Sequence, residues 1–313
     1  MDYIELITKA FGKRKITAVW NCLQPPFDYD TGWPLKLPDM KFNPDTILLL
    51  HFQDFVHPGL LELVQIEKKY GDYARQVVVV YFSHGLEEVY HGPINLIEFS
   101  NHNYWTATAV AARRNEWLLA FDQPRTLAWQ CLNGRTCSHR LRVVNVLREW
   151  ENGIYSYGGE TNLTKWDYST YRGTENDENF IRLADVYAKC AVNIVTETQY
   201  DARPGVVSEK AFLAFAAGQI PIVIGQPEIV RDCEELGFDM FTDLVDTSYD
   251  TMPNNVRAEQ ALLLNKDLIL GKIDLAPYRD QLDKQREFLL DVYPGLMQER
   301  LVKAVNKFLN ISV

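Results

Sequence analysis

The chain has 313 residues, of which 47% are hydrophobic and 24% are charged, so its composition is that of a globular protein long enough for two hydrophobic cores. No apolar run approaches the ~20 residues of a membrane span, and the amino-terminal stretch lacks the apolar block of a signal peptide. We therefore expect a cytoplasmic protein. The net charge of −10 argues against a nucleic-acid partner, because affinity for a phosphate backbone rests on Lys and Arg, although it leaves room for a locally basic cleft.

The five cysteines are scattered, and no two of them have the CxxC spacing of a metal or redox site. We therefore expect buried free thiols in a reducing compartment. The histidines of the first half match no common metal-ligand spacing, and turn or core positions account for them. They are His51, His57, His84, His91 and His102.

Apolar, β-rich runs alternate with helical segments through the first part of the chain. We expect helices at Asp2–Phe11, Pro58–Tyr70 and within Trp105–Phe121, and strands at Lys15–Cys22, Thr46–Phe52, Gln76–Phe82 and Ile94–Phe99. Such alternation is typical of a doubly wound α/β domain. The segment Leu23–Pro44 is too long for a plain connection and is rich in Pro, Asp, Gly and aromatic residues, which predicts a functional or mobile loop.

A hinge is predicted at the polar segment Phe121–Arg125, so that residues 1–122 form one α/β lobe and residues 123–313 a second, whose terminal helices could return to the first. In the second lobe we expect strands at Leu127–Leu132, Gly153–Tyr157, Ala191–Thr198 and Ile220–Ile224, and helices at His139–Trp150, Phe180–Cys190, Ser208–Ala217, Pro227–Leu236 and Ala258–Leu268, with two more between Ala276 and Leu309, broken near Pro294. The strand, helix and strand from Ala191 to Ile224 predict a βαβ unit with a parallel pair.

The helix of this βαβ unit opens with an unusual pair of charges. Ser208 can cap it, and Glu209 suits its positive end, but Lys210 is disfavoured there by roughly 0.3–1 kcal/mol. A local rule that is broken without evident compensation often marks a functional site. Free backbone N–H groups, the helix dipole and an ammonium would together suit a phosphate, whereas the alternative is an exposed lysine with its charge in water.

A second polar cluster follows the strand Leu127–Leu132. Asn133, Arg135, His139 and Arg140 gather at the carboxyl end of that strand, which is where open α/β sheets bind ligands. The planar fork of arginine suits diphosphate oxygens. The alternatives are solvated arginines and a histidine that is merely polar at a helix start.

The stretch TETQYDARPGVVSEKAFLAFAAGQIPIVIG, residues 196–225, resembles the donor-binding motif of α-1,3-fucosyltransferase-like glycosyltransferases. That motif is an extended strand, a variable loop, a Glu-Lys pair opening a helix, a small-residue turn and a strand ending in Gly. The chain is still more similar to fucosyltransferase-like proteins of tailed phages and aquatic bacteria, through EKAF, GQIPIVIG, LGFDMF and an NGRxxxHR run. The resemblance covers residues 127–150 and 190–250. Thr198 stands where the family usually has Asn, and the loop after it also differs, so the donor sugar stays open.

The resemblance implies two facing Rossmann-like lobes of the GT-B type, with the nucleotide-sugar donor on the second lobe. In the family the Glu of the pair contacts the ribose and the Lys contacts the diphosphate, which carries over to Glu209 and Lys210. The further donor-binding residues that we expect are Asn133, Arg135, His139, Arg140, Glu197 and Ser208. The implied reaction moves a sugar from a nucleotide diphosphate to an acceptor hydroxyl, with inversion and without a metal or other cofactor.

An inverting transfer needs a carboxylate that takes the proton of the acceptor hydroxyl. Asp54 fits best, because it follows the strand Thr46–Phe52 and strand ends line the cleft in this architecture. The carboxylates to consider next are Glu87, Glu88 and Glu98. Asp28 and Asp30 form a literal DxD, but they lie in the long first-lobe loop and are interpreted as loop acids, so no metal is expected.

The acceptor is predicted to enter over the first lobe, where Phe27 and Trp33 could stack on a sugar or a base. It is either a glycan or a hydroxymethylated pyrimidine in phage DNA, and the second would require an extruded base and a basic channel. The phage resemblance favours DNA, whereas the net charge favours a glycan. A different class of function is a non-catalytic nucleotide-sugar or carbohydrate-binding protein.

Overall fold

The computed structural model describes residues 11, 15–20, 37–51, 60–81, 86–99, 101–134, 136–158, 160–162, 184–201 and 207–311. The chain divides into two compact units, one formed by Met1–Tyr104 with Gly295–Val313 and the other by Trp105–Pro294. Each unit holds a mainly parallel sheet with helices, which confirms the predicted α/β class. The boundary between the units precedes the predicted division after Asp122, and the end of the chain joins the first unit.

The sheet of the first unit has four parallel strands that lie in chain order. They are β1 (Lys15–Trp20), β2 (Thr46–His51), β3 (Val77–Tyr81) and β4 (Asn95–Glu98). A doubly wound sheet requires a reversal of strand order. The described strands of this unit contain no such reversal, so the doubly wound arrangement predicted for it is not found among them.

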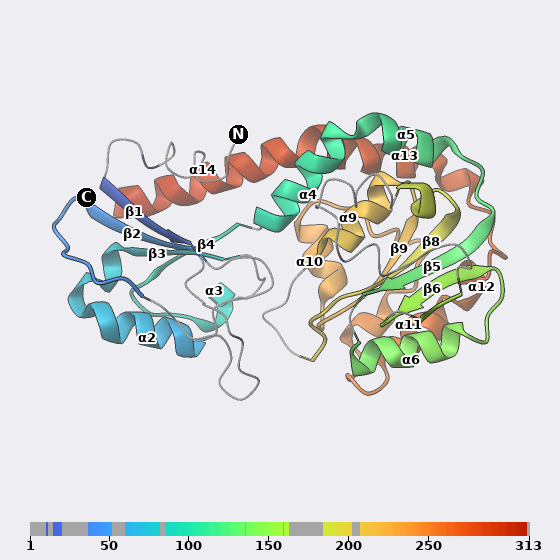
Figure 1. Ribbon diagram of the computed structural model, residues 1–313, viewed down its shortest axis with the longest axis horizontal. Helices are drawn as coiled ribbons and strands as arrows, with labels where there is room; N and C mark the ends of the chain where they lie inside the picture. The colour runs from blue at the N-terminus through green and yellow to red at the C-terminus, as the bar shows by residue number, and fades with distance from the viewer. Residues whose placement is uncertain are drawn as a thin grey trace. The chain divides into compact units, whose positions relative to one another are not determined.

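Both faces of this first sheet are covered. β3 is buried at every position, because its sequence VVVVY is apolar on both faces. On one face the sheet packs against α2 (Leu60–Tyr70), and Figure 1 shows the carboxyl-terminal helix α14 (Tyr293–Ile311) along the other. The shorter helical segments near this sheet are η1 (Gly71–Gln76) and α3 (Leu86–Val89), and α4 (Asn101–Ala112) follows β4.

The sheet of the second unit has the order β7-β6-β5-β8-β9. Its strands are β5 (Leu127–Asn133), β6 (Gly153–Tyr157), β7 (Glu160–Thr161), β8 (Cys190–Thr196) and β9 (Ile220–Ile224), and all pairs are parallel except the edge pair of β6 and β7. From β5 the chain moves outward to β6 and then returns to β8 on the other side of β5. Strand order therefore reverses between β5 and β8, and the carboxyl ends of these two strands form the switch point where such sheets bind ligands.

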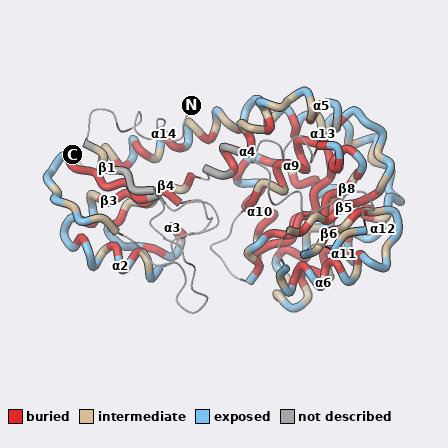
Figure 2. The backbone as a smooth tube through the Cα atoms, viewed as in Figure 1, coloured by how far each residue is buried: buried red, intermediate tan, exposed pale blue. Residues whose placement is uncertain are grey.

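Helices cover both faces of the second sheet (Figure 1). α6 (Ser138–Leu147) and α11 (Arg257–Leu264) pack together on one face, and α9 (Glu209–Ala216) lies on the other with α5 (Arg114–Asp122) and α13 (Arg279–Glu287). From its third residue α9 is wholly buried, because AFLAFA is apolar all round. Figure 2 shows buried backbone concentrated in the strands and in α9. The other described helical segments are α10 (Ile229–Glu235), η2 (Ser248–Thr251), α12 (Lys266–Ile269), η3 (Ala276–Tyr278) and the π-helical η4 (Phe288–Val292).

The end of the chain is a continuous helical run. α13, η4 and α14 follow one another without a gap, and Pro294 is the second residue of α14. Within this continuous run Pro294 cannot donate a backbone hydrogen bond to the preceding turn, and the π-helical segment η4 lies directly before it. The predicted pair of helices is confirmed, but the predicted break at Pro294 is instead a junction between helix types. Within the described part of the chain, no helix has both the length and the apolar character needed to cross a membrane.

Candidate functional site at the switch point of the second sheet

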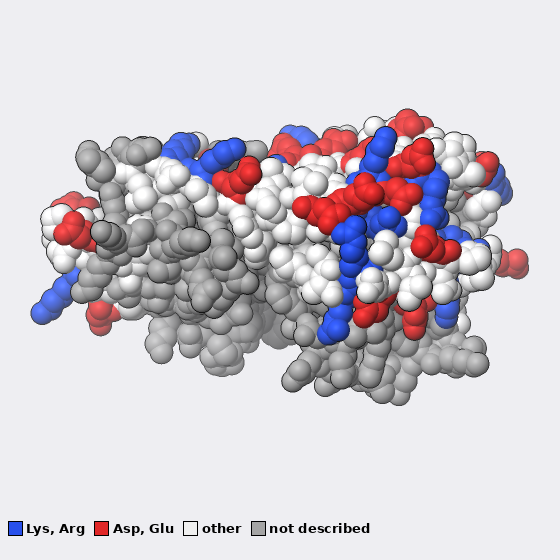
Figure 3. Space-filling model, turned by 90° about the horizontal axis from the view of Figure 1, so that it is seen from above, with Lys and Arg blue, Asp and Glu red and all other residues white. Residues whose placement is uncertain are grey.

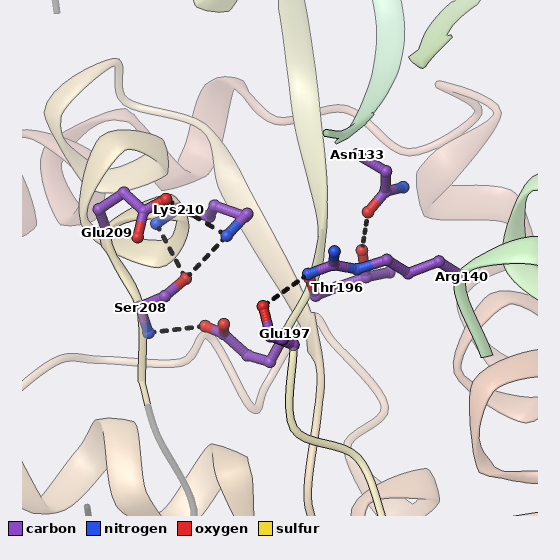
Figure 4. Close-up of polar contacts among 8 residues, drawn as sticks. Asn133, Arg140, Thr196, Glu197, Ser208, Glu209 and Lys210 are labelled. Atoms are coloured by element: carbon purple, nitrogen blue, oxygen red, sulfur yellow. Dashed lines mark hydrogen bonds and ion pairs between the residues drawn. The ribbon is translucent and has the colours of Figure 1, made fainter. Parts of the chain in front are cut away.

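Asn133 and Thr196 join the carboxyl ends of β5 and β8. The Thr196 hydroxyl donates a hydrogen bond to Oδ1 of Asn133 (Figure 4). The Asn133 backbone N–H donates to Ser156 Oγ of β6 at 3.0 Å, and its Nδ2 donates to Cys131 Sγ at 3.2 Å. Asn133 is fully buried. It therefore ties three strand ends together.

Arg140 reaches across the switch point from the first turn of α6. Its Nη2 donates to the backbone oxygen of Thr196 at 2.9 Å (Figure 4) and to Thr198 Oγ1 at 3.2 Å. The residue is only 1% exposed. The guanidinium that we expected to meet a phosphate is thus directed at the end of β8 and at the Thr198 hydroxyl just after it.

His139 contacts the next residue of the same segment. Its Nε2 lies 2.8 Å from the backbone oxygen of Glu197, and since a carbonyl only accepts, Nε2 carries the hydrogen. The ring stacks on Tyr200 with 4.4 Å between centroids and 3° between planes. Burial lowers the pKa of His139 to about 4. His139 is therefore neutral near pH 7 and brings no positive charge to the site.

Tyr200 is the centre of a cluster that sequence reasoning missed. Its hydroxyl donates to the backbone oxygen of Asn254 at 2.8 Å and accepts from the N–H of Ala258 at 3.0 Å. The guanidinium of Arg257 lies over the ring, 4.5 Å from its centroid, and donates to the backbone oxygen of Tyr200. These partners lie more than fifty residues from Tyr200 in the sequence, so no local sequence pattern predicts the contacts.

Glu197 links the end of β8 to the start of α9. Its carboxylate is buried, with 1% of the residue exposed, and Oε1 accepts the Ser208 N–H at 2.8 Å (Figure 4). A Cβ on Gly225 would lie 3.1 Å from the Cβ of Glu197, so the glycine at the end of β9 leaves room for this side chain. Burial raises the pKa of the Glu197 carboxyl, although Lys210 and the Ser208 N–H oppose the rise.

Lys210 pairs with its own neighbours at the start of α9. Its Nζ donates to Ser208 Oγ at 3.2 Å and to Glu209 Oε1 at 3.3 Å, and it lies near enough to Glu197 to lower the pKa of that carboxyl (Figure 4). Ser208 is the N-cap of α9 and accepts the Lys210 N–H at 3.4 Å. The interpretation of Lys210 as a cation without structural compensation is therefore wrong. About a fifth of its side chain is exposed, 21%, so Lys210 is not sealed off from solvent.

Asp250, which the sequence did not single out, caps α10, the helix that follows β9. Its two carboxylate oxygens accept the N–H groups of Ile229 at 3.1 Å and Val230 at 3.0 Å, in the first turn of α10. Burial raises the pKa of Asp250 to about 6. Spacing gives no signal for this contact, because the acid follows the helix that it caps by about twenty residues.

Acidic side chains also gather at the strand ends of the first unit. Glu98, the last residue of β4, is the register partner of Tyr81, the last residue of β3. Partial burial and the charge of Glu98 raise the pKa of Glu87 in α3, while Lys307 of α14 opposes the rise. Burial and the charges of Glu87 and Glu98 also raise the pKa of the Tyr81 hydroxyl.

Several predicted residues lie outside the described part of the chain. They are Asp54, Arg135, the acids Asp28 and Asp30, and the aromatic residues Phe27 and Trp33. Among the residues that the structure describes, no group of three or more His, Cys, Asp or Glu side chains is arranged to hold a metal ion.

The outer face that carries α5 and α13 has mixed charge. Figure 3 shows acidic and basic side chains interspersed over its described part. Arg114 pairs with Asp291 at 2.5 Å and Arg279 pairs with Asp122 at 3.0 Å. This face therefore does not present the one-signed basic surface that a DNA backbone favours.

Comparison of the chain with models of protein families finds none that matches. Comparison with curated proteins finds no sequence of significant similarity.

Proposed function

We propose that the protein is a glycosyltransferase whose nucleotide-diphosphate donor binds at the start of α9. The observation that carries the proposal is the convergence of Glu197, Ser208, Glu209 and Lys210 where β8 ends and α9 begins, beside the reversal of strand order. Ligands of open α/β sheets bind at such a reversal, and helix starts favour phosphate. The likeness of residues 196–225 to a donor-binding motif supports the same assignment.

In this proposal Lys210 supplies the positive charge for the donor diphosphate. Negative charge grows on the diphosphate as the bond to the sugar breaks, and a fixed cation there stabilises the transition state. Glu209, with a quarter of its side chain exposed, 25%, accepts hydrogen bonds from the ribose hydroxyls. Arg135 remains the predicted second cation.

Asn133, His139 and Arg140 take a different part from the one first expected. Their polar atoms bond to the end of β8 and to the backbone oxygens of Thr196 and Glu197. We therefore propose that they hold in place the segment that leads from β8 to α9. Such support matters in catalysis, since a small displacement of a binding group weakens transition-state stabilisation.

The base that activates the acceptor is assigned to the first unit. Asp54 remains the first candidate from the sequence. Glu87 is the second, because partial burial and Glu98 raise the pKa of its carboxyl and so make it a better proton acceptor. The acceptor is a glycan or a hydroxymethylated pyrimidine in DNA.

The test is a thermal-shift panel with UDP, GDP, CDP and sugars linked to them. A ligand that binds only the native state raises the melting temperature in proportion to RT ln(1 + [L]/Kd), so one nucleotide family is expected to stabilise the protein. Release of the nucleoside diphosphate from the stabilising donor, with and without candidate acceptors, separates a transferase from a non-catalytic binding protein. If no nucleotide raises the melting temperature, the proposal fails.

A further inference from the structure

The ammonium of Lys210 already has acidic neighbours in the protein without ligand. Its Nζ donates to Glu209 Oε1 at 3.3 Å and to Ser208 Oγ at 3.2 Å, and the N–H of the same Ser208 donates to the buried Glu197 carboxylate at 2.8 Å. The charge of Lys210 lowers the pKa of that carboxyl, against the effect of burial. A diphosphate at the start of α9 would compete with these carboxylates for the same positive charge. An isolated buried carboxylate is strongly disfavoured and binds a proton instead.

We propose that Glu197 is a positioning residue which takes up a proton when the donor binds. The inference rests on the function proposed above. As Lys210 turns toward the diphosphate, one proton from solvent binds the Glu197 carboxylate and gives a neutral carboxylic acid. The remaining carbonyl-type oxygen still accepts the Ser208 N–H, so the start of α9 keeps its place.

Among the described charged and titratable groups around the Glu197 carboxylate, Lys210 is the one whose displacement would raise the pKa of Glu197. Among the described residues, Lys210 and Glu209 face it from α9 and Cys233 faces it from α10. Burial raises the pKa of the Cys233 thiol, so this group is neutral near pH 7, and Glu209 favours protonation of Glu197. His139 of α6, which bonds the backbone oxygen of Glu197, is also neutral there.

The sign of the pH dependence follows from proton uptake. In this proposal the pKa of Glu197 is lower in the free protein than in the complex with donor. At a pH between these two values, the complex therefore holds more protons than the free protein. Affinity for the donor therefore rises as the pH falls through that range. Nucleotide-diphosphate sugars are suitable probes, because their diphosphate carries no proton that titrates near neutral pH.

The experiment is calorimetry with the nucleotide sugar that stabilises the protein, at one pH in buffers of low and high ionisation enthalpy, such as phosphate and Tris. We expect the observed enthalpy to change with the buffer, with a slope of up to about one proton taken up. Glu197→Gln keeps an oxygen for the Ser208 N–H but cannot titrate, so its slope should fall to zero. Asp250→Asn removes a different buried carboxyl and should keep the slope.

A second measurement needs no donor. In Lys210→Met the pKa of Glu197, followed by NMR of carboxyl-labelled glutamate, should be higher than in the wild type. An unchanged pKa overturns the inference even if Glu197→Gln does not fold. Donor binding with the same enthalpy in every buffer also overturns it while the proposed function stands. If no nucleotide sugar binds, the proposed function and the inference fall together.

Discussion

Buried charged side chains in the second unit act mainly on the backbone. Arg140 holds the backbone oxygen of Thr196, and Asp250 holds two N–H groups at the start of α10. Arg125, which is partly buried, donates to the backbone oxygens of Tyr187, Ala188 and Gly218 at 3.1, 2.8 and 3.3 Å, and also to that of Ala217. Removing such a side chain leaves buried backbone groups without a hydrogen-bond partner, which costs about 1–3 kcal/mol for each group, so we expect these residues to matter for folding before they matter for chemistry.

His139 and Asp250 should make opposite contributions to stability as the pH changes. The pKa of His139 falls to about 4 on folding, so its contribution is lost as the pH drops from about 6.5 toward 4. The pKa of Asp250 rises to about 6, so its ionisation destabilises the protein as the pH climbs from about 4 to 6. Each shift corresponds to about 3 kcal/mol, and in the wild type the two largely cancel.

Single variants should uncover each contribution in denaturant titrations between about pH 4 and 7. Asp250→Asn should lose stability as the pH falls, because His139 remains. His139→Gln, which can still donate to the Glu197 oxygen, should lose stability as the pH rises. Parallel pH profiles for the wild type and both variants would contradict the assigned shifts.

Lys210 should matter for donor binding through its charge. Lys210→Met is expected to weaken nucleotide-diphosphate binding by about 1.5–3 kcal/mol, which is roughly 10–100-fold in Kd, because a charge-assisted hydrogen bond is lost. Lys210→Arg should keep most of the affinity. Calorimetry with the nucleotide that the thermal-shift panel selects provides the measurement, and equal affinity in wild type and Lys210→Met would remove Lys210 from the site.

At the scale of elements, the α9–β9 connection depends on close approach. Gly218 ends α9 with φ of +61°, and a Cβ there would overlap the Phe121 ring of α5. Gly218→Ala should therefore lose about 1–2 kcal/mol from the left-handed backbone and a further 1–3 kcal/mol from overpacking.

Two other glycines serve as matched controls in thermal unfolding. Gly71 also has a positive φ, of +55°, but open space around it, so Gly71→Ala should show the backbone effect alone. Gly295 of α14 has neither constraint, and Gly295→Ala should leave stability unchanged or raise it by up to ~1 kcal/mol. Equal losses at Gly218 and Gly71 would show that the contact with Phe121 is unimportant.

The residues proposed for the donor and for the base belong to different units of the chain. The donor residues belong to the second unit, and the candidate bases Asp54 and Glu87 belong to the first. A base acts as the acceptor hydroxyl attacks, so its loss should lower kcat with little effect on donor affinity.

Two substitutions decide between the bases. Asp54→Asn is expected to lower kcat by ~10²–10⁴-fold, the usual contribution of general-base catalysis, with donor affinity unchanged. Glu87→Gln is the matched test, and a larger loss there would transfer the role to Glu87. If both variants keep near wild-type turnover, the base lies elsewhere and Glu98 is the next residue to test.

The sequence by itself predicted those parts of the second unit whose signals are local. The βαβ unit of β8, α9 and β9 could be predicted because its strands are apolar runs, Ser208 caps the helix and Gly218 follows its end. The same local signals predicted that Glu209 and Lys210 lie at the start of the helix that follows β8. They also led us to expect free cations at Arg140 and Lys210. The partner of Arg140 lies 56 residues away and leaves no local signal, whereas Lys210 pairs with the adjacent Ser208 and Glu209, a contact that depends on how its side chain folds back over the helix start.

The tertiary structure decided where those charges are directed. Arg140 meets Thr196, which is 56 residues away, and Tyr200 meets Asn254 and Ala258, 54 and 58 residues away. The strand order of each sheet, the capping of α10 by Asp250 and the return of α14 to the first unit were decided at the same level. Propensity and capping act over a few residues, whereas a buried charge takes whichever partner packing brings to it, because leaving it unpaired is too unfavourable.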